Sequence, residues 1–141
     1  MYIGVDLGGT NIAAGLVKPD GEIVLKKSIP TPPGHDVEGI IKAMADISLS
    51  LVEEAGVDKS EVKWVGIGTP GTVDNENGVI IYANNLDFRN TPAAAMFQKY
   101  WDIPVYLGND ANCAALGEAY AGAAKDCQTA IMITLGTGLG G

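Results

Sequence analysis

This chain of 141 residues lacks the features that mark nucleic-acid-binding and membrane proteins. Its 9 Lys and Arg are outnumbered by 17 Asp and Glu, and no basic run exceeds Lys26-Lys27. A formal charge of -8 without a basic patch excludes nucleic acid and anionic membranes as expected partners. No uninterrupted apolar run approaches the ~20 residues that a transmembrane helix needs. We therefore expect no membrane and no nucleic-acid partner.

Cysteine and histidine are also scarce. Cys113 and Cys127 lack the close spacing of a metal or redox pair, and two cysteines are too few for a disulfide framework. We expect reduced thiols, and, with no basic targeting segment before the first apolar residues, a cytoplasmic protein. His35 stands in a Pro/Gly loop without a carboxylate or cysteine at ligand spacing, so a solvated histidine is favoured over a metal ligand.

The chain does have apolar residues and glycine in quantity. Apolar residues make up 47% of it and charged residues 18%, which is enough for one compact domain with a core. Many of the 19 glycines directly follow apolar, β-branched runs. This placement indicates strand ends that approach a ligand. An acidic protein can still bind ATP, because backbone N–H groups and magnesium hold phosphates without lysines.

The first half of the chain predicts three antiparallel strands and a helix. Apolar runs separated by turn residues give a meander of strands at 2–6, 12–17 and 22–29. The Pro-rich residues 30–34 form a connecting loop. Apolar residues then recur every three or four positions over 37–55, which predicts a helix that ends at Gly56.

The second half predicts strands that alternate with helices. The expected elements are a buried strand at 64–67, a hairpin from Val73 and 79–82 around residues 75–78, a helix at 91–100 with Thr91 as N-cap, a strand at 105–107, a helix at 111–124 and a strand at 129–135. Three antiparallel strands followed by alternating helices and strands predict an α/β fold with a mixed sheet.

Two strand-and-turn units resemble each other. An apolar strand runs into Gly and Thr after residue 6, and another does so after residue 135. The similarity suggests a duplicated, two-lobed architecture. We expect residues 1–128 to form a first lobe and residues 129–141 to begin a second lobe.

The loop at residues 6–11 is a candidate phosphate site. Its glycines allow a tight turn with outward N–H groups, the Thr10 hydroxyl adds a donor, and Asp6 is placed to reach magnesium through water. The candidate phosphate ligands here are Asp6, Gly8, Gly9, Thr10 and Asn11. The alternative is an ordinary hairpin with Asp and Asn as turn formers.

The loop at residues 136–141 is its counterpart, with Gly136, Thr137 and Gly138 as candidate phosphate ligands. This loop and residues 66–71 both satisfy the bare G-x-G-x-x-G pattern of dinucleotide-binding proteins. The context excludes that reading, because the first match contains Pro70 and is followed by a turn, and no helix follows the second match. A Gly-Lys-Ser/Thr sequence is absent, which excludes a P-loop enzyme.

Polar residues at other strand ends complete the candidate site. Asp110 follows a short strand and is the candidate general base, since deprotonating a sugar hydroxyl requires a positioned carboxylate. The alternative is that Asn109 or Asp110 merely caps the next helix. Residues 68–71 and 84–86 add backbone and side-chain amides suited to several hydroxyls, although for Asn84 turn formation alone is the favoured explanation.

Four segments together resemble the ROK family of sugar kinases. They are the loop at 6–11, GIGTPGTVD at 66–74, NDANCAALGE at 109–118 and the loop at 136–141. The resemblance implies a ribonuclease H-like, actin-like ATPase lobe. It also implies that Asp110 is the catalytic base, that Gly71, Asn85, Asn109 and Asp110 surround the sugar, and that ATP and Mg²⁺ bind the two Gly/Thr loops.

The resemblance also sets expectations for a longer parent protein. Such kinases continue into a lobe with a cysteine-rich zinc motif, further sugar ligands and the adenine pocket, which we expect beyond this chain; Cys113 and Cys127 do not match that motif. ROK repressors carry a helix-turn-helix ahead of the first loop, whereas five residues precede Asp6 here, which disfavours a repressor.

We expect the parent, as a homo-oligomer, to phosphorylate a hexose with ATP, with glucose at its 6-position favoured over fructose, mannose or an N-acetylated hexose. The 141-residue chain alone should be nearly inactive, because catalysis needs both walls of the cleft. The alternatives are a non-catalytic sugar sensor or scaffold, and an actin-like assembly ATPase.

Overall fold

A mixed five-stranded sheet forms the centre of the computed structural model, which describes residues 1–83, 86–135 and 139–140. The strands lie in the order β3-β2-β1-β4-β8. Their bounds are β1 Tyr2–Leu7, β2 Asn11–Val17, β3 Ile23–Pro30, β4 Val65–Thr69 and β8 Val105–Asn109. Strands β1, β2 and β3 form the expected antiparallel meander, whereas β4 and β8 run parallel to β1. The predicted mixed α/β fold is confirmed.

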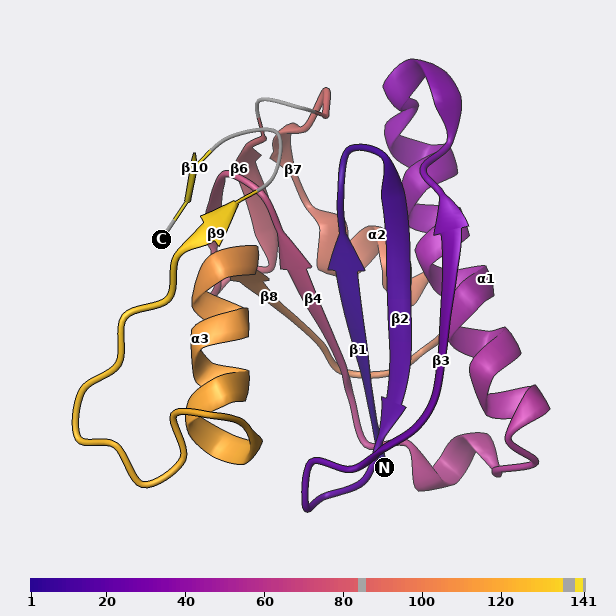
Figure 1. Ribbon diagram of the computed structural model, residues 1–141. Helices are drawn as coiled ribbons and strands as arrows, with labels where there is room; N and C mark the ends of the chain where they lie inside the picture. Colours follow the sequence, from indigo (N-terminus) through magenta and orange to yellow (C-terminus); the bar gives the residue numbers. More distant parts are fainter. Residues whose placement is uncertain (84–85, 136–138, 141) are drawn as a thin grey trace.

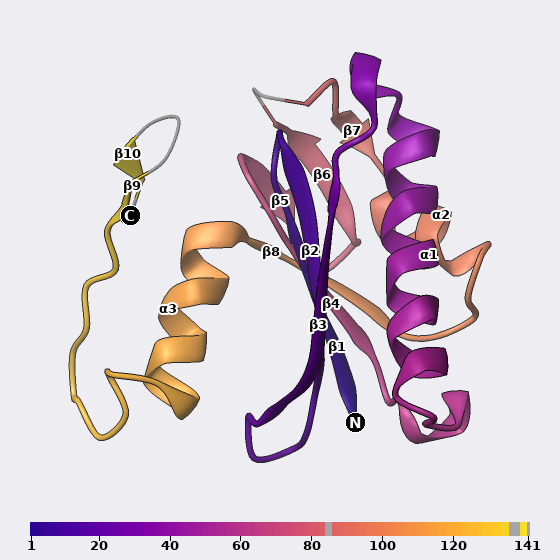
Figure 2. The same ribbon diagram turned by 45° about the vertical axis from the view of Figure 1, so that its right-hand side comes forward.

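Helices cover both faces of this sheet (Figures 1 and 2). Helices α1 (Val37–Glu54) and α2 (Ala93–Gln98) lie on one face, and α3 (Asp110–Ala121) lies on the other. Short 3₁₀ turns occupy Pro33–His35 and Lys59–Glu61. Among the described residues, none of the helices combines the length and apolar composition needed to span a bilayer.

Helix α1 follows the predicted pattern closely. The Asp36 side chain caps its start by accepting a hydrogen bond from the Gly39 N–H at 3.0 Å. Its buried face consists of residues three or four apart, which all point at the sheet. They are Ile40, Ile41, Met44, Ala45, Ile47, Ser48, Leu51 and Val52.

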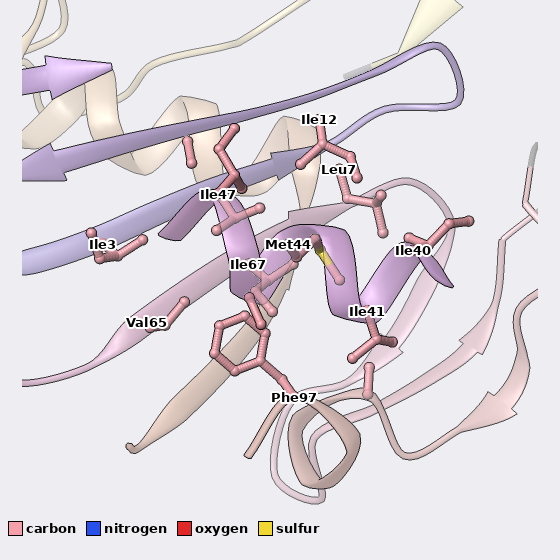
Figure 3. Packing of buried hydrophobic residues seen from close by; sticks show 14 of the residues in the cluster. Ile3, Leu7, Ile12, Ile40, Ile41, Met44, Ile47, Val65, Ile67 and Phe97 are labelled. Carbon is pink, nitrogen blue, oxygen red and sulfur yellow. The ribbon is translucent and has the colours of Figure 1, made fainter. Parts of the chain in front are cut away.

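The core lies between α1 and the central strands (Figure 3). Alternation along β1 buries Ile3, Val5 and Leu7 on the α1 side and leaves Gly4 and Asp6 exposed on the other side. Phe97 of α2 closes the core beside Ile41 and Ile67 and is fully buried. The sheet therefore has one face packed tightly against α1 and one more open face toward α3. Asp6 lies on the more open face.

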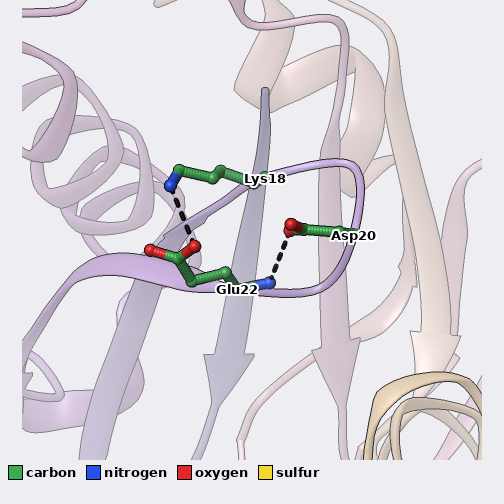
Figure 4. Close-up of polar contacts among 3 residues, drawn as sticks. All are labelled: Lys18, Asp20 and Glu22. Atoms are coloured by element: carbon green, nitrogen blue, oxygen red, sulfur yellow. Dashed lines mark hydrogen bonds and ion pairs between the residues drawn. The ribbon is translucent and has the colours of Figure 1, made fainter.

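The turn between β2 and β3 links the sheet to α3. Lys18 Nζ contacts Glu22 Oε2 at 2.9 Å, and the Glu22 N–H donates to Asp20 Oδ1 at 3.1 Å (Figure 4). The Tyr120 hydroxyl, near the end of α3, donates to the Pro19 carbonyl at 3.0 Å. This bond fastens the far end of α3 to the turn.

A second, three-stranded sheet corrects one expectation. It comprises β5 (Thr72–Asp74), β6 (Val79–Tyr82) and β7 (Arg89–Thr91), and it confirms the predicted hairpin. The prediction that Thr91 caps a helix was wrong. Thr91 pairs with Ile80 in the ladder, and its hydroxyl is directed at the Arg89 carbonyl, so α2 begins after Pro92 without a side-chain cap.

The end of the chain differs from the prediction as well. Helix α3 stops at Ala121 rather than at 124, because Gly122 is extended. Within 129–135 only Thr134–Leu135 forms a strand, β9, which pairs with β10 (Leu139–Gly140) and not with the central sheet. The apolar residues that predicted a strand at 129–135 are exposed, with Ile131 at 86% and Ile133 at 64%.

The core makes a direct prediction about stability. Replacing the fully buried Ile40 by alanine should lower the free energy of unfolding by about 3 kcal/mol, because it removes three carbons from a packed site. The matched change Ile131→Ala, at an exposed isoleucine, should alter it by less than about 0.5 kcal/mol. Urea unfolding followed by circular dichroism measures both. Equal effects would contradict the assignment of the core to the α1 face.

Candidate functional site

The carboxyl ends of β1, β4 and β8 meet at one edge of the sheet. The register places Asp6 opposite Gly68, Gly68 opposite Gly108, and Thr69 opposite Asn109. Asp110 follows directly and begins α3. A cavity of about 700 Å³ on the α3 side includes Asp6, Gly68 and Asp110 in its lining. Two carboxylates far apart in the sequence therefore share one cavity.

These carboxylates influence each other electrostatically. The pKa of Asp6 is raised, first by partial burial of its carboxylate among the strand ends and second by the negative charge of Asp110. The pKa of the Cys113 thiol is raised too, by burial and then by Asp110 and Asp6. An unbalanced negative potential at this edge favours a cation between the carboxylates.

A threonine after β3 donates two hydrogen bonds to the turn that follows β1. The Gly8 N–H donates to the Asn11 carbonyl at 3.0 Å, and a Cβ on Gly8 would lie 2.8 Å from that oxygen. Thr31, just after β3, donates its hydroxyl to the Gly8 carbonyl at 2.7 Å and its N–H to the Thr10 carbonyl at 2.8 Å. Sequence reasoning treated residues 30–34 only as a connection and missed Thr31. The available signal was a lone polar residue between Pro30 and Pro32.

The start of α3 shows which of Asn109 and Asp110 caps the helix and which is left beside the cavity. Asn109 is the cap: its Oδ1 accepts from the Asn112 N–H at 3.2 Å, while its Nδ2 donates to the Gly71 carbonyl at 3.2 Å. Asp110 lies in the first turn, where its Oδ1 accepts from the Ala111 N–H at 2.8 Å. The capping role thus belongs to Asn109, and Asp110 remains beside the cavity.

Gly71 connects the second sheet to this edge. Its φ of +87° is accessible mainly to glycine, and a Cβ there would lie 2.0 Å from the Tyr82 carbonyl oxygen. Gly71, Asn109 and Asn112 line a second cavity of about 540 Å³, and Cys113 borders both cavities. Two of the expected sugar residues, Gly71 and Asn109, therefore lie together, with Asp110 next along the chain.

The remaining candidate residues lie outside the part of the chain that the structure describes. They are Asn85 among the sugar residues, and Gly136, Thr137 and Gly138 of the second phosphate loop. The strands on either side of that loop, β9 and β10, pair antiparallel with Leu139 opposite Leu135.

Comparisons with known proteins agree on one family. The family model described as "ROK family" matches residues 2–141. A glucokinase from Thermotoga maritima is 39% identical over 140 residues, which are 99% of this chain and 43% of that protein. A xylose repressor from Caldicellulosiruptor bescii is 32% identical over 138 residues, covering 98% of this chain and 35% of that protein.

A solved structure is similar over nearly the whole chain. It is a ROK family glucokinase from Streptomyces griseus in complex with glucose and AMPPNP, with a TM-score of 0.89 and 42% identity. The match covers 99% of this chain and 42% of that one. The chain thus spans less than half the length of these relatives. The similarity confirms the expected actin-like ATPase lobe.

The partial burial of Asp6, together with the negative charge of Asp110, predicts a pH-dependent effect on stability. Because the folded-state pKa is raised, ionised Asp6 costs stability at neutral pH, and Asp6→Asn should raise the free energy of unfolding at pH 7. Solvent screening limits the gain to about 0.5 kcal/mol. The gain should disappear as the pH falls below the unfolded-state value of 3.8. Asp74→Asn should have the opposite sign at pH 7, because Asn77 lowers the pKa of Asp74. Urea unfolding at several pH values measures these free energies. A gain in stability of Asp6→Asn that does not depend on pH would contradict an origin in the ionised Asp6 carboxylate.

Gly71 predicts a difference between two glycine substitutions. Gly71→Ala should destabilise the chain by about 2 kcal/mol or more, since it combines an unfavourable φ with a backbone clash. Gly117→Ala is the control, because nothing lies within 4 Å of its Cβ position inside α3, and it should stabilise by about 0.8 kcal/mol. Thermal unfolding compares the two. A tolerated alanine at position 71 would mean that the β5–β6 hairpin adopts another conformation.

Proposed function

The chain belongs to the ROK family, and we propose that its parent protein transfers the γ-phosphoryl group of ATP to a hydroxyl of a hexose, with glucose as the favoured acceptor. The observation that carries the proposal is that Asp6 and Asp110, at the ends of two strands, line one cavity, and the turn at residues 8–10 begins two residues after Asp6. Phosphoryl transfer needs chiefly alignment and charge neutralisation, and this edge offers groups for both.

Asp110 is the proposed general base. It begins a helix directly after a strand and borders the cavity without serving as the helix cap. As the hexose oxygen attacks the γ-phosphorus, its proton passes to the Asp110 carboxylate and ADP leaves with the bonding electron pair. Gly71, Asn109 and Asn85 are proposed to orient the sugar, and the cavity shared by Gly71 and Asn109 supports this for the first two.

The two Gly/Thr turns are proposed to hold the phosphates of ATP. Gly8, Gly9, Thr10 and Asn11 contribute from the first turn, and Gly136, Thr137 and Gly138 from the second. In this proposal residues 1–128 form one lobe of the enzyme and residues 129–141 begin the other. The separate pairing of β9 with β10, away from the central sheet, supports that boundary.

Magnesium fits the donor set at this edge. Asp6 and Asp110 supply hard oxygen ligands, and a cation would relieve both the partial burial of the Asp6 carboxylate and its repulsion from Asp110. Among the described residues no group of three or more His, Cys, Asp or Glu could hold a metal ion by itself. Asp6 would hold Mg²⁺ through water, and the ion would neutralise charge on the phosphates. The family's zinc motif is proposed to lie outside this chain.

A non-catalytic sugar-responsive regulator is the second candidate. The similarity to the xylose repressor supports it, because that relative shares the same stretch of chain. The two candidates differ in turnover: a regulator would bind a sugar without releasing ADP. In either case we propose a cytoplasmic homo-oligomer that acts on soluble small molecules, in keeping with the acidic, patch-free composition.

Asp110→Asn tests the proposed chemistry in the parent protein. The amide cannot accept the hydroxyl proton, so kcat should fall by about 10³-fold while the Kd values for glucose and AMPPNP change less than about threefold. Asp102→Asn, an exposed acid near the start of β8, should keep full activity. A coupled ATP/glucose assay and calorimetry supply the readouts.

Three results would contradict the proposal. Full activity in Asp110→Asn would remove the general base. Absence of ADP release from the parent, with glucose still bound, would favour the regulator. Normal turnover by the 141-residue chain alone would contradict the requirement for two walls around the substrate.

A further inference from the structure

We propose that Thr31 is a positioning residue, whose hydroxyl turns the Gly9 amide of the phosphate turn toward the Asp6–Asp110 edge. The inference rests on the proposed function of that turn as a phosphate site. It concerns a residue outside the turn, separated from it in sequence by the whole of β2 and β3.

The contacts of Thr31 are all directed at the turn. Its hydroxyl reaches the Gly8 carbonyl at 2.7 Å, and its backbone N–H reaches the Thr10 carbonyl at 2.8 Å. Thr31 is 9% exposed, so water has little access to compete with either hydrogen bond. One buried residue therefore restrains two of the carbonyl groups between β1 and β2.

The sidedness of the sheet gives the orientation. Strand alternation places Thr31 on the same side as Ile29 and the α1 core, whereas Asp6 lies on the open side. The Gly8 carbonyl, bonded to the Thr31 hydroxyl, is thus drawn toward the core side. Within a trans peptide the C=O and the next N–H point in opposite directions, so the Gly9 N–H is directed toward the open side.

This orientation matters because carbonyl oxygens repel phosphate and N–H groups attract it. A turn free to rotate its Gly8–Gly9 peptide would present either group to the side of the sheet that carries Asp6, and glycine at both positions leaves that rotation sterically easy. The Thr31 hydroxyl removes this freedom in advance, so that ligand binding does not have to supply the ordering. A valine of the same shape would fill the site but lose the restraint.

The experiment uses the 141-residue chain with three variants. Thr31→Val removes the hydroxyl, Thr31→Ser retains it, and Thr91→Val makes the same chemical change at a threonine of similar burial, 7% exposed, on β7. Amide hydrogen exchange of Gly8, whose N–H bonds across the turn to Asn11, reports the turn itself. Calorimetric titration of the same variants in the parent protein with AMPPNP and magnesium reports phosphate binding, because the adenine pocket is expected beyond this chain.

Thr31→Val should speed Gly8 exchange and weaken AMPPNP binding, each by about tenfold, the effect of losing one buried hydrogen bond. Thr31→Ser should stay within about twofold of the original chain, and Thr91→Val should change neither quantity even if it lowers the unfolding temperature. These results would support the positioning role, because lower stability alone would affect both valine variants.

The readouts separate this inference from the proposed function. AMPPNP binding and Gly8 exchange unchanged in Thr31→Val would overturn the positioning role and leave the function intact. The same would follow if Thr91→Val matched Thr31→Val in both quantities. Absence of AMPPNP binding by the unsubstituted parent protein, with faster Gly8 exchange in Thr31→Val, would overturn the phosphate site and retain Thr31 as the residue that orders the turn.

Discussion

The parallel pairing of β1 with β4, and of β4 with β8, is the constraint on which the site depends. It brings the ends of three strands, which are separated by about sixty and forty residues in sequence, to a common edge. Parallel strands require long crossovers, and here α1 and α2 supply them on one face. The pairing of these strands brings Asp6 and Asp110 to one edge, and the two helices cover the face of the sheet away from them.

One face of the sheet forms the hydrophobic core, and the opposite face lines the cavity. The face toward α1 carries Ile, Leu and Val and forms the core. The opposite face carries small residues where the strands approach the cavity, namely Gly4, Gly66, Gly68 and Gly108. A Cβ at Gly108 would lie 2.5 Å from the Cys113 sulfur, so α3 can approach β8 only over glycine. The cavity is thus accessible because these positions are glycines, which have no side chain to fill it.

Much of this arrangement was predictable from periodicity and turn residues. Strands of the meander, the helix at 37–55 and the hairpin after Gly71 follow from local patterns, and they agree with the structure. Elements defined by tertiary context were not predictable. Thr91 looks like a helix cap until its pairing with Ile80 is known, and residues 129–135 look like one strand although only Thr134–Leu135 form one, paired with β10. Thr31 was missed because its importance comes from a contact across 23 residues.

The side-chain amide of Asn109, at the start of α3, restricts which residues this position tolerates. The Asn109 side chain caps the helix through its oxygen and bridges to the Gly71 carbonyl through its nitrogen. Aspartate or serine satisfies the cap, but aspartate offers no donor at neutral pH and serine lacks the reach for both partners. Two unrelated demands therefore fall on a single position, and only the short amide meets both. Variation there would have to be accompanied by a change in the hairpin at Gly71, so the two segments are expected to evolve as a pair.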